Sequence, residues 1–154
     1  MIFFDSEDSL EKALNHFAMK NKRCLGLVSL DVPLISNLDI WINIALIRQY
    51  HQNLSRSEAE KEVWEYLRRY HLEKIAHKRS PALTNQERFR VMLLRAAMVA
   101  NATIVIDRPF KIMPELQDSR FIFESIGVID DLYSESRIFD YFWFQDRYRI
   151  SDAT

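Results

Sequence analysis

The most direct candidate for chemistry in this sequence is an acid at the end of an apolar run. The run ATIVID ends at Asp107, and Arg108 follows it. A carboxylate in this position often holds the metal ion in phosphate chemistry. The general base of such a site must accept a proton, whereas an arginine stays protonated at any relevant pH. We therefore predict that Asp107 is a structural acid, paired with Arg108 or with Arg90, and that no residue of the chain is catalytic.

Other catalytic and ligand-binding patterns are missing from the sequence. A loop that cradles phosphates needs several glycines, but Gly26 and Gly127 are the two glycines present, and neither precedes Gly-Lys-Ser/Thr. The histidines have no metal-ligand spacing to one another or to a cysteine, and no nucleophile elbow is found. These histidines are His16, His51, His71 and His77. We expect no bound metal and no cofactor, with ATP and Mg²⁺ as the weaker alternative.

Composition limits the class of protein further. The chain has 154 residues, 48% of them hydrophobic, which suits one domain with a core. Its net charge of -1 lacks the basic footprint of a nucleic-acid partner. Cys24 is the one cysteine, which excludes an internal disulfide and suits a reducing compartment. Because the N-terminus is acidic and no apolar run reaches the ~18 residues of a membrane span, we expect a cytoplasmic protein without direct membrane insertion.

The elements that position Asp107 follow from the hydrophobic pattern. Residues 1–4, 25–29 and 103–107 are apolar runs typical of strands, the last of them a central one. A helix is predicted over 9–20 with Ser9 as N-cap, and further helices over 40–51, 54–76 and from 85 onward. The last two start with the capping boxes Ser55/Glu58 and Thr84/Glu87. This alternation predicts an α/β fold with a mostly parallel sheet and an inserted helical subdomain at about 33–100.

The C-terminal third is harder to divide. Residues 114–126 are predicted to form a helix and residues 127–130 a short strand. Residues 131–140 are predicted as helix, and residues 141–150 alternate like a strand pair at a sheet edge.

Three stretches in this order resemble the ATPase domain of ABC (ATP-binding cassette) transporters. Residues 24–46 resemble the family's Q-loop and the helix after it, and residues 54–110 its helical subdomain, signature and Walker B strand. Residues 128–150 are similar to the switch-histidine strand and the closing strands. The resemblance implies a P-loop NTPase-like fold. Because the matches begin after the family's P-loop helix, it also implies one truncated domain, 1–154, missing the N-terminal P-loop part.

The resemblance also shows where the family's chemistry is absent. Leu30 occupies the Q-loop glutamine position, and the signature reads Thr84-Asn85-Gln86 before Glu87 instead of Ser-Gly-Gly. Side chains on Asn85 and Gln86 would crowd the approach of a helix N-terminus to a phosphate.

The remaining departures lie in the second half of the chain. The Walker B acid is kept as Asp107, but Arg108 replaces the catalytic glutamate. The switch histidine position falls on Asp130, and Tyr148 stands where the closing turn usually has glycine. Together these residues predict a vestigial site.

These features predict a degenerate, non-catalytic ABC-ATPase-like subunit or regulator, a pseudo-ATPase. Its implied partners are a permease, docked at a groove of residues 31–50 and the helix from Ser55, or an active ATPase subunit. It would then lie peripheral to the inner membrane. Loss of the P-loop strand and helix would bare one layer of the sheet and favour self-association. The alternatives are one half of a composite ATPase that lends Asp107, a stand-alone interaction module, and a decayed gene product.

Overall fold

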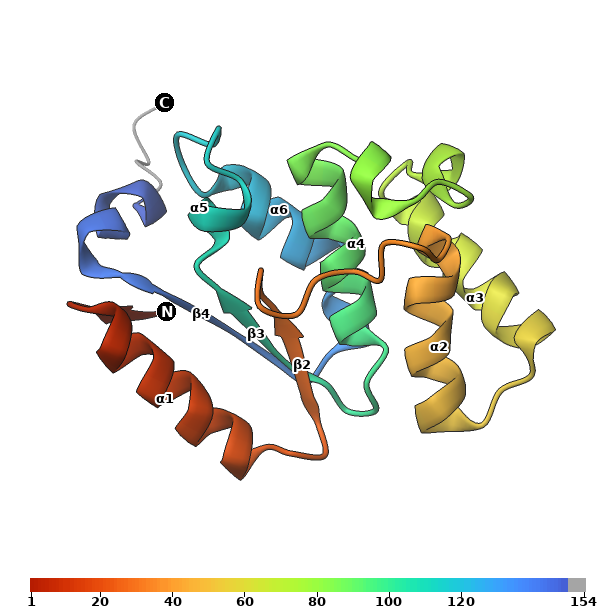
Figure 1. The fold of residues 1–154 in the computed structure, drawn as a ribbon, viewed down its shortest axis with the longest axis horizontal. Coiled ribbons are helices and arrows are strands. Elements are labelled where there is room, and N and C mark those ends of the chain that lie inside the picture. Colours follow the sequence, from red (N-terminus) through yellow and green to blue (C-terminus); the bar gives the residue numbers. More distant parts are fainter. Residues whose placement is uncertain (150–154) are drawn as a thin grey trace.

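A computed structural model describes residues 1–149, which form a parallel four-stranded sheet in the order β1-β4-β3-β2 (Figure 1). The strands are β1 (Ile2–Phe4), β2 (Leu25–Val28), β3 (Thr103–Asp107) and β4 (Glu135–Tyr141). In register, Asp107 pairs with Phe139, and Phe4 pairs with Tyr141. The carboxyl ends of the strands therefore meet at one edge. The predicted α/β fold with a parallel sheet is confirmed.

The sheet has a thickly covered face and a thinly covered face. On one face, helices α4 and α6 pack over Val28, Ile104 and Ile106 in the main core (Figure 1). On the other face, α1 covers a small cluster built around Leu10 and Phe139. Every residue of β3 is buried, as expected for a strand between two neighbours.

Helices occupy most of the rest of the chain. The α-helices are α1 (Glu7–Lys20), α2 (Ile40–Gln52), α3 (Arg56–Arg69), α4 (Asn85–Ala97), α5 (Pro109–Ile112) and α6 (Arg120–Val128). Short 3₁₀ helices are η1 (Glu73–Ile75), η2 (Ser80–Ala82), η3 (Asp130–Leu132) and η4 (Phe142–Tyr148). Both predicted capping boxes, at the starts of α3 and α4, are confirmed. The helix predicted to run to residue 76 ends earlier, because His71 takes a left-handed conformation with φ of 56°.

The N-terminal segment differs from the prediction. The N-cap of α1 is Ser6, whose side chain accepts a hydrogen bond from the Ser9 backbone N–H. Strand β1 pairs with β4, and Asp5 and Ser6 alone separate β1 from α1. Strand, turn and helix follow in the order that a P-loop unit uses, without a phosphate-binding loop between them. The expectation that this layer of the sheet would be bare was wrong.

The predictions for the C-terminal third were also wrong. Residues 127–130 end α6 and begin η3, and the segment expected to be helical contains β4. The expected strand pair over 141–150 is the 3₁₀ helix η4 as far as Tyr148, and residue 150 lies outside the described residues. β4 is a strand because β1 and β3 pair with both of its edges, and this tertiary pairing overrides local pattern.

Helix α4 lies unusually close to β2. A Cβ atom placed on Gly26 would stand 2.3 Å from the carbonyl oxygen of Ala96. Glycine at this position therefore allows the helix backbone to rest directly on the strand. Within residues 1–149, no helix is both long enough and apolar enough to cross a membrane.

Candidate functional site

The carboxyl edge of the sheet is organised around Arg108. This side chain is 4% exposed, and its guanidinium donates to both carboxylate oxygens of Asp107, from Nε at 2.7 Å and from Nη2 at 3.2 Å. Its Nη1 donates to the hydroxyl of Tyr141 at 3.2 Å. Of the two pairings predicted for Asp107, the structure contains the one with Arg108.

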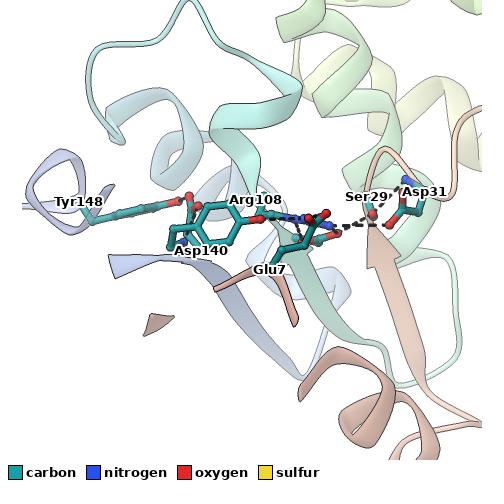
Figure 2. Close-up of polar contacts among 8 residues, drawn as sticks. Glu7, Ser29, Asp31, Arg108, Asp140 and Tyr148 are labelled. Atoms are coloured by element: carbon teal, nitrogen blue, oxygen red, sulfur yellow. Dashed lines mark hydrogen bonds and ion pairs between the residues drawn. The ribbon is translucent and has the colours of Figure 1, made fainter. Parts of the chain in front are cut away.

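Two more acids face the same guanidinium from other elements. Glu7, in the first turn of α1, lies 3.7 Å from Nη1, and Asp31, after β2, lies 3.8 Å from Nη2. Figure 2 shows Glu7, Asp31 and Arg108 converging from three parts of the chain. We call Glu7, Asp31, Asp107, Arg108 and Tyr141 the edge network. A single buried cation holds together the ends of β2, β3 and β4 and the start of α1.

The backbone of Arg108 adopts a strained conformation that directs its side chain into the edge network. Its φ is 48°, in the left-handed region, which costs a residue other than glycine about 1–2 kcal/mol. Its N–H donates to the carbonyl of Phe139 at 2.8 Å, so β4 fixes the bend. The bend ends β3, starts α5 at Pro109, and turns the side chain back over Asp107. Strain of this kind persists where surrounding contacts hold it.

Asp107 has a second partner in Ser29, whose hydroxyl donates to Oδ2 at 2.7 Å. Ser29 Oγ in turn accepts from the Asp31 N–H at 3.1 Å (Figure 2). The Asp107 side chain is 2% exposed. Burial works to lower the pKa of the Arg108 guanidinium, but hydrogen bonds to Asp107 and Tyr141 outweigh it, and the net pKa is raised. The guanidinium is therefore a permanent charge.

Asp140 forms a second buried polar pair behind the edge network. Its Oδ2 accepts from the hydroxyl of Tyr148 at 2.5 Å, and its Oδ1 accepts from the Tyr141 N–H at 2.8 Å (Figure 2). Burial raises the pKa of Asp140, and the hydrogen bonds from Tyr148 and Tyr141 oppose this shift. Burial likewise raises the pKa of Tyr148.

The raised pKa of Asp140 gives a testable pH dependence. A carboxyl whose pKa is higher in the folded state contributes stability below its unfolded pKa of about 3.9, and this contribution is lost as pH rises through the folded value. Asp140→Asn removes this titration, keeps one oxygen to accept from the Tyr141 N–H, and lets its amide N–H donate to the Tyr148 hydroxyl oxygen. We therefore expect the stability of the variant relative to wild type to increase between about pH 4 and about pH 7. Urea unfolding across this range measures the difference, and a constant difference would contradict the assignment.

The signature-like segment lies at the start of α4. Thr84 Oγ1 accepts from the Glu87 N–H at 3.1 Å, and Glu87 Oε1 accepts from the Thr84 N–H at 2.9 Å. Asn85 donates to Glu115 at 3.2 Å, and Gln86 lines a shallow pocket with Glu87. The helix start is therefore capped by its own side chains.

Three other predicted site positions make no contact in the edge network. Leu30 is exposed in the loop after β2 and has no polar group to offer. Asp130 is exposed in η3, before β4, and helix α6 directly precedes it. It therefore does not follow a strand end, as the switch position was expected to. Tyr148 is buried at the end of η4, and its hydroxyl binds Asp140.

The comparisons with known proteins agree with this architecture. No family model matches the chain. The Molybdate/tungstate import ATP-binding protein WtpC of Pyrococcus abyssi (strain GE5 / Orsay) is 27% identical over 103 residues, which are 67% of this chain and 30% of that protein. The dimeric post-hydrolysis structure of the ATP-binding cassette MJ0796, bound to ADP and Pi, superposes with a TM-score of 0.59 at 18% identity.

A second dimeric structure of MJ0796, a bacterial ABC transporter cassette, gives a TM-score of 0.60 at 21% identity. The fold is that of an ABC ATPase cassette. The two superpositions cover 86% and 82% of this chain but 58% and 56% of the cassettes. The chain thus spans less than two thirds of the length of the relatives it matches.

Sequence patterns identified Asp107 and Arg108 but missed the other members of the edge network. Glu7, Asp31 and Tyr141 stand at or just after the carboxyl ends of β1, β2 and β4. In open parallel sheets, this edge is where ligands and functional side chains gather. The signal was available for Asp31, because its strand was predicted correctly. It was not available for Tyr141, because its strand was predicted as a helix.

Proposed function

We propose that this chain is a non-catalytic ABC-ATPase-like subunit or regulator of a membrane transport complex. The observation that carries the proposal is the position of Arg108. Its guanidinium contacts Asp107, which has the place of a metal-binding acid, and both oxygens of that acid already accept hydrogen bonds. An internal cation takes the role that Mg²⁺ has in a phosphate-transfer site.

The start of α1 supports the same proposal. In a P-loop protein, the first backbone N–H groups of such a helix bind phosphate. Here Ser6 caps the helix, and Glu7 and Asp8 place negative charge in its first turn. These acids stabilise the helix dipole and repel a phosphate. Among the described residues, no group of three acidic, histidine or cysteine side chains is arranged to hold a metal ion. These groups do not fit a magnesium nucleotide.

The composite-ATPase alternative is less well supported. It requires Asp107 to be available to a metal brought by another chain. The carboxylate is 2% exposed and held by Arg108 and Ser29, so a metal would have to displace a buried ion pair. Breaking such a pair costs about 3–5 kcal/mol.

The partner part of the proposal rests on surface chemistry and on the relatives. Large apolar side chains are exposed along the loop after β2 and the outer face of α2, and a shallow hollow lies between α2 and the start of α3. The exposed residues are Leu30, Val32, Ile35, Leu46 and Tyr50. A concentration of apolar side chains on one surface favours a protein contact. The transport setting comes from WtpC, whose name describes an import ATP-binding protein.

The test is a calorimetric titration of the purified chain with ATP and Mg²⁺. We expect no saturable heat at micromolar nucleotide, because the acid and both helix starts are already occupied by protein groups. Micromolar binding would overturn the non-catalytic proposal. Copurification with a permease or an active ATPase subunit tests the transport part separately, and recovery of neither from native membranes would contradict it.

A further inference from the structure

A cavity lies on the thinly covered face of the sheet, between α1 and β2. Its volume is about 340 Å³, within the range of about 300–1,000 Å³ typical of ligand sites. It is half enclosed because α1 leans toward β1 and β4, where it makes its main contacts, and leaves β2 partly uncovered. Its apolar wall is formed by side chains of α1, β2 and β3, including Leu27 and Val105. We call it the α1–β2 cavity.

The polar groups of this cavity have one sign of charge. Glu11 of α1, Asp31 after β2 and Asp107 of β3 line it, and Asn15 and Ser29 add neutral polar groups. Of the described residues that line it, none is a lysine or an arginine. Asp107 is neutralised by Arg108, and Asp31 lies at the long distance of 3.8 Å from the same guanidinium. Among the described residues, Glu11 has no ion-pair partner, so negative charge is left over at the mouth.

The acidic side chains and the apolar side chains lie at opposite ends of the α1–β2 cavity. Asp31 and Asp107 stand at the carboxyl edge of the sheet, whereas Phe17 and Leu25 line the far end. The Arg137 guanidinium on β4 lies 5.1 Å from the centre of the Phe17 ring and is paired with Glu135 at 2.7 Å. A cation would therefore be attracted to the acids at the carboxyl edge, with its apolar part toward the far end.

We propose that the α1–β2 cavity binds a small organic cation, with an ammonium group near Glu11 and Asp31 and an apolar body against Leu27. An anionic nucleotide does not fit this cavity, because the leftover charge is negative. A metal ion does not fit it either, since the described carboxylates are not grouped to coordinate one. This proposal goes beyond the proposed function. The cavity shares Asp31 and Asp107 with the edge network, and amine binding tests the cavity separately from the ATP titration.

The test compares three probes of one shape and different charge by NMR of the ¹⁵N-labelled chain. Phenethylamine is the cation, 2-phenylethanol is its neutral match, and 3-phenylpropionate is the anion. We expect the amine to bind at least about ten-fold more tightly than the other two, the factor expected from hydrogen bonds to charged acceptors. Its shifts should map to α1 and β2. Equal affinity for the alcohol, shifts elsewhere, or no saturable binding of the amine would overturn the proposal.

Variants that fill or neutralise the cavity complete the test. Leu27→Trp fills the cavity from the sheet, and Ala18→Leu fills it from the helix. If one variant fails to fold, the other still tests whether a filled cavity loses amine binding. Each folded variant should lose amine binding. Glu11→Gln should weaken it several-fold, whereas Glu124→Gln, the same charge change on α6 across the sheet, should not. Unchanged affinity in a folded filling variant, or equal loss in both glutamine variants, would overturn the proposal.

Discussion

Replacing Arg108 with methionine is expected to lower the free energy of unfolding by about 3–5 kcal/mol, the cost of removing one partner of a buried ion pair. The Asp107 carboxylate, 2% exposed, would keep Ser29 as its neutral partner, and Glu7 and Asp31 would lose the cation between them. Methionine would keep the backbone hydrogen bond to Phe139 but would adopt the left-handed backbone without the side-chain contacts of Arg108. Urea unfolding followed by tryptophan fluorescence measures the loss.

Arg68→Met is the matched control. Arg68 is 60% exposed and pairs with Glu65 on the surface of α3, so its loss should cost less than about 1 kcal/mol. A double-mutant cycle with Asp107→Asn isolates the pair, and we expect a coupling energy of about 1–3 kcal/mol. If Arg108→Met stayed within about 1 kcal/mol of wild type, the edge network would not be the structural centre of this sheet edge.

Gly26→Ala is expected to destabilise the fold by about 3 kcal/mol, at the upper end of the overpacking range. The new methyl group would stand 2.3 Å from the carbonyl oxygen of Ala96 and 2.8 Å from its carbonyl carbon. The obstacle is helix backbone, which cannot rotate away like a side chain, so α4 would have to lift from β2. Thermal and urea unfolding should both report the change.

Gly127 supplies the control for this substitution. It lies in α6, and an added Cβ meets no atom within 4 Å among those described. Gly127→Ala should therefore stabilise the chain by about 0.5–1 kcal/mol, because alanine favours helix and restricts the unfolded chain. Similar effects of the two substitutions would mean that the close approach of α4 and β2 has been misjudged.

Local patterns predicted the fold best where they were strong and repeated. β3 is a run of β-branched apolar residues ending in Asp107, and the helices α3 and α4 begin with complete capping boxes. These signals depend on neighbours in sequence. β4 carries charged residues, Glu135 and Arg137, on the half-exposed part of the strand, and residues 131–140 were predicted as helix. β4 pairs with β1, which lies near the other end of the sequence. A local hydrophobic pattern carries no information about such a distant pairing.

The sequence predicted that an acid and an arginine meet at the end of β3, but it did not predict which other residues join them in the edge network. The sequence left Arg108 and Arg90 open as partners of Asp107, and the left-handed backbone of Arg108 turns its side chain onto Asp107. That Glu7 joins them depends on β1 pairing with β4, which places the start of α1 at the same edge. Two residues about a hundred positions apart in sequence meet there because of topology. The cavity has the same origin, since it depends on how α1 leans across the sheet.

The two-residue turn between β1 and α1 determines how this chain can change over generations. Phosphate loops of the Gly-x-x-x-x-Gly-Lys-Ser/Thr type span eight positions between strand and helix, whereas Asp5 and Ser6 span this junction. A point substitution at Arg108 can restore an acid, but no point substitution lengthens a turn. A phosphate loop of that length at this junction would require an insertion, an event rarer than substitution.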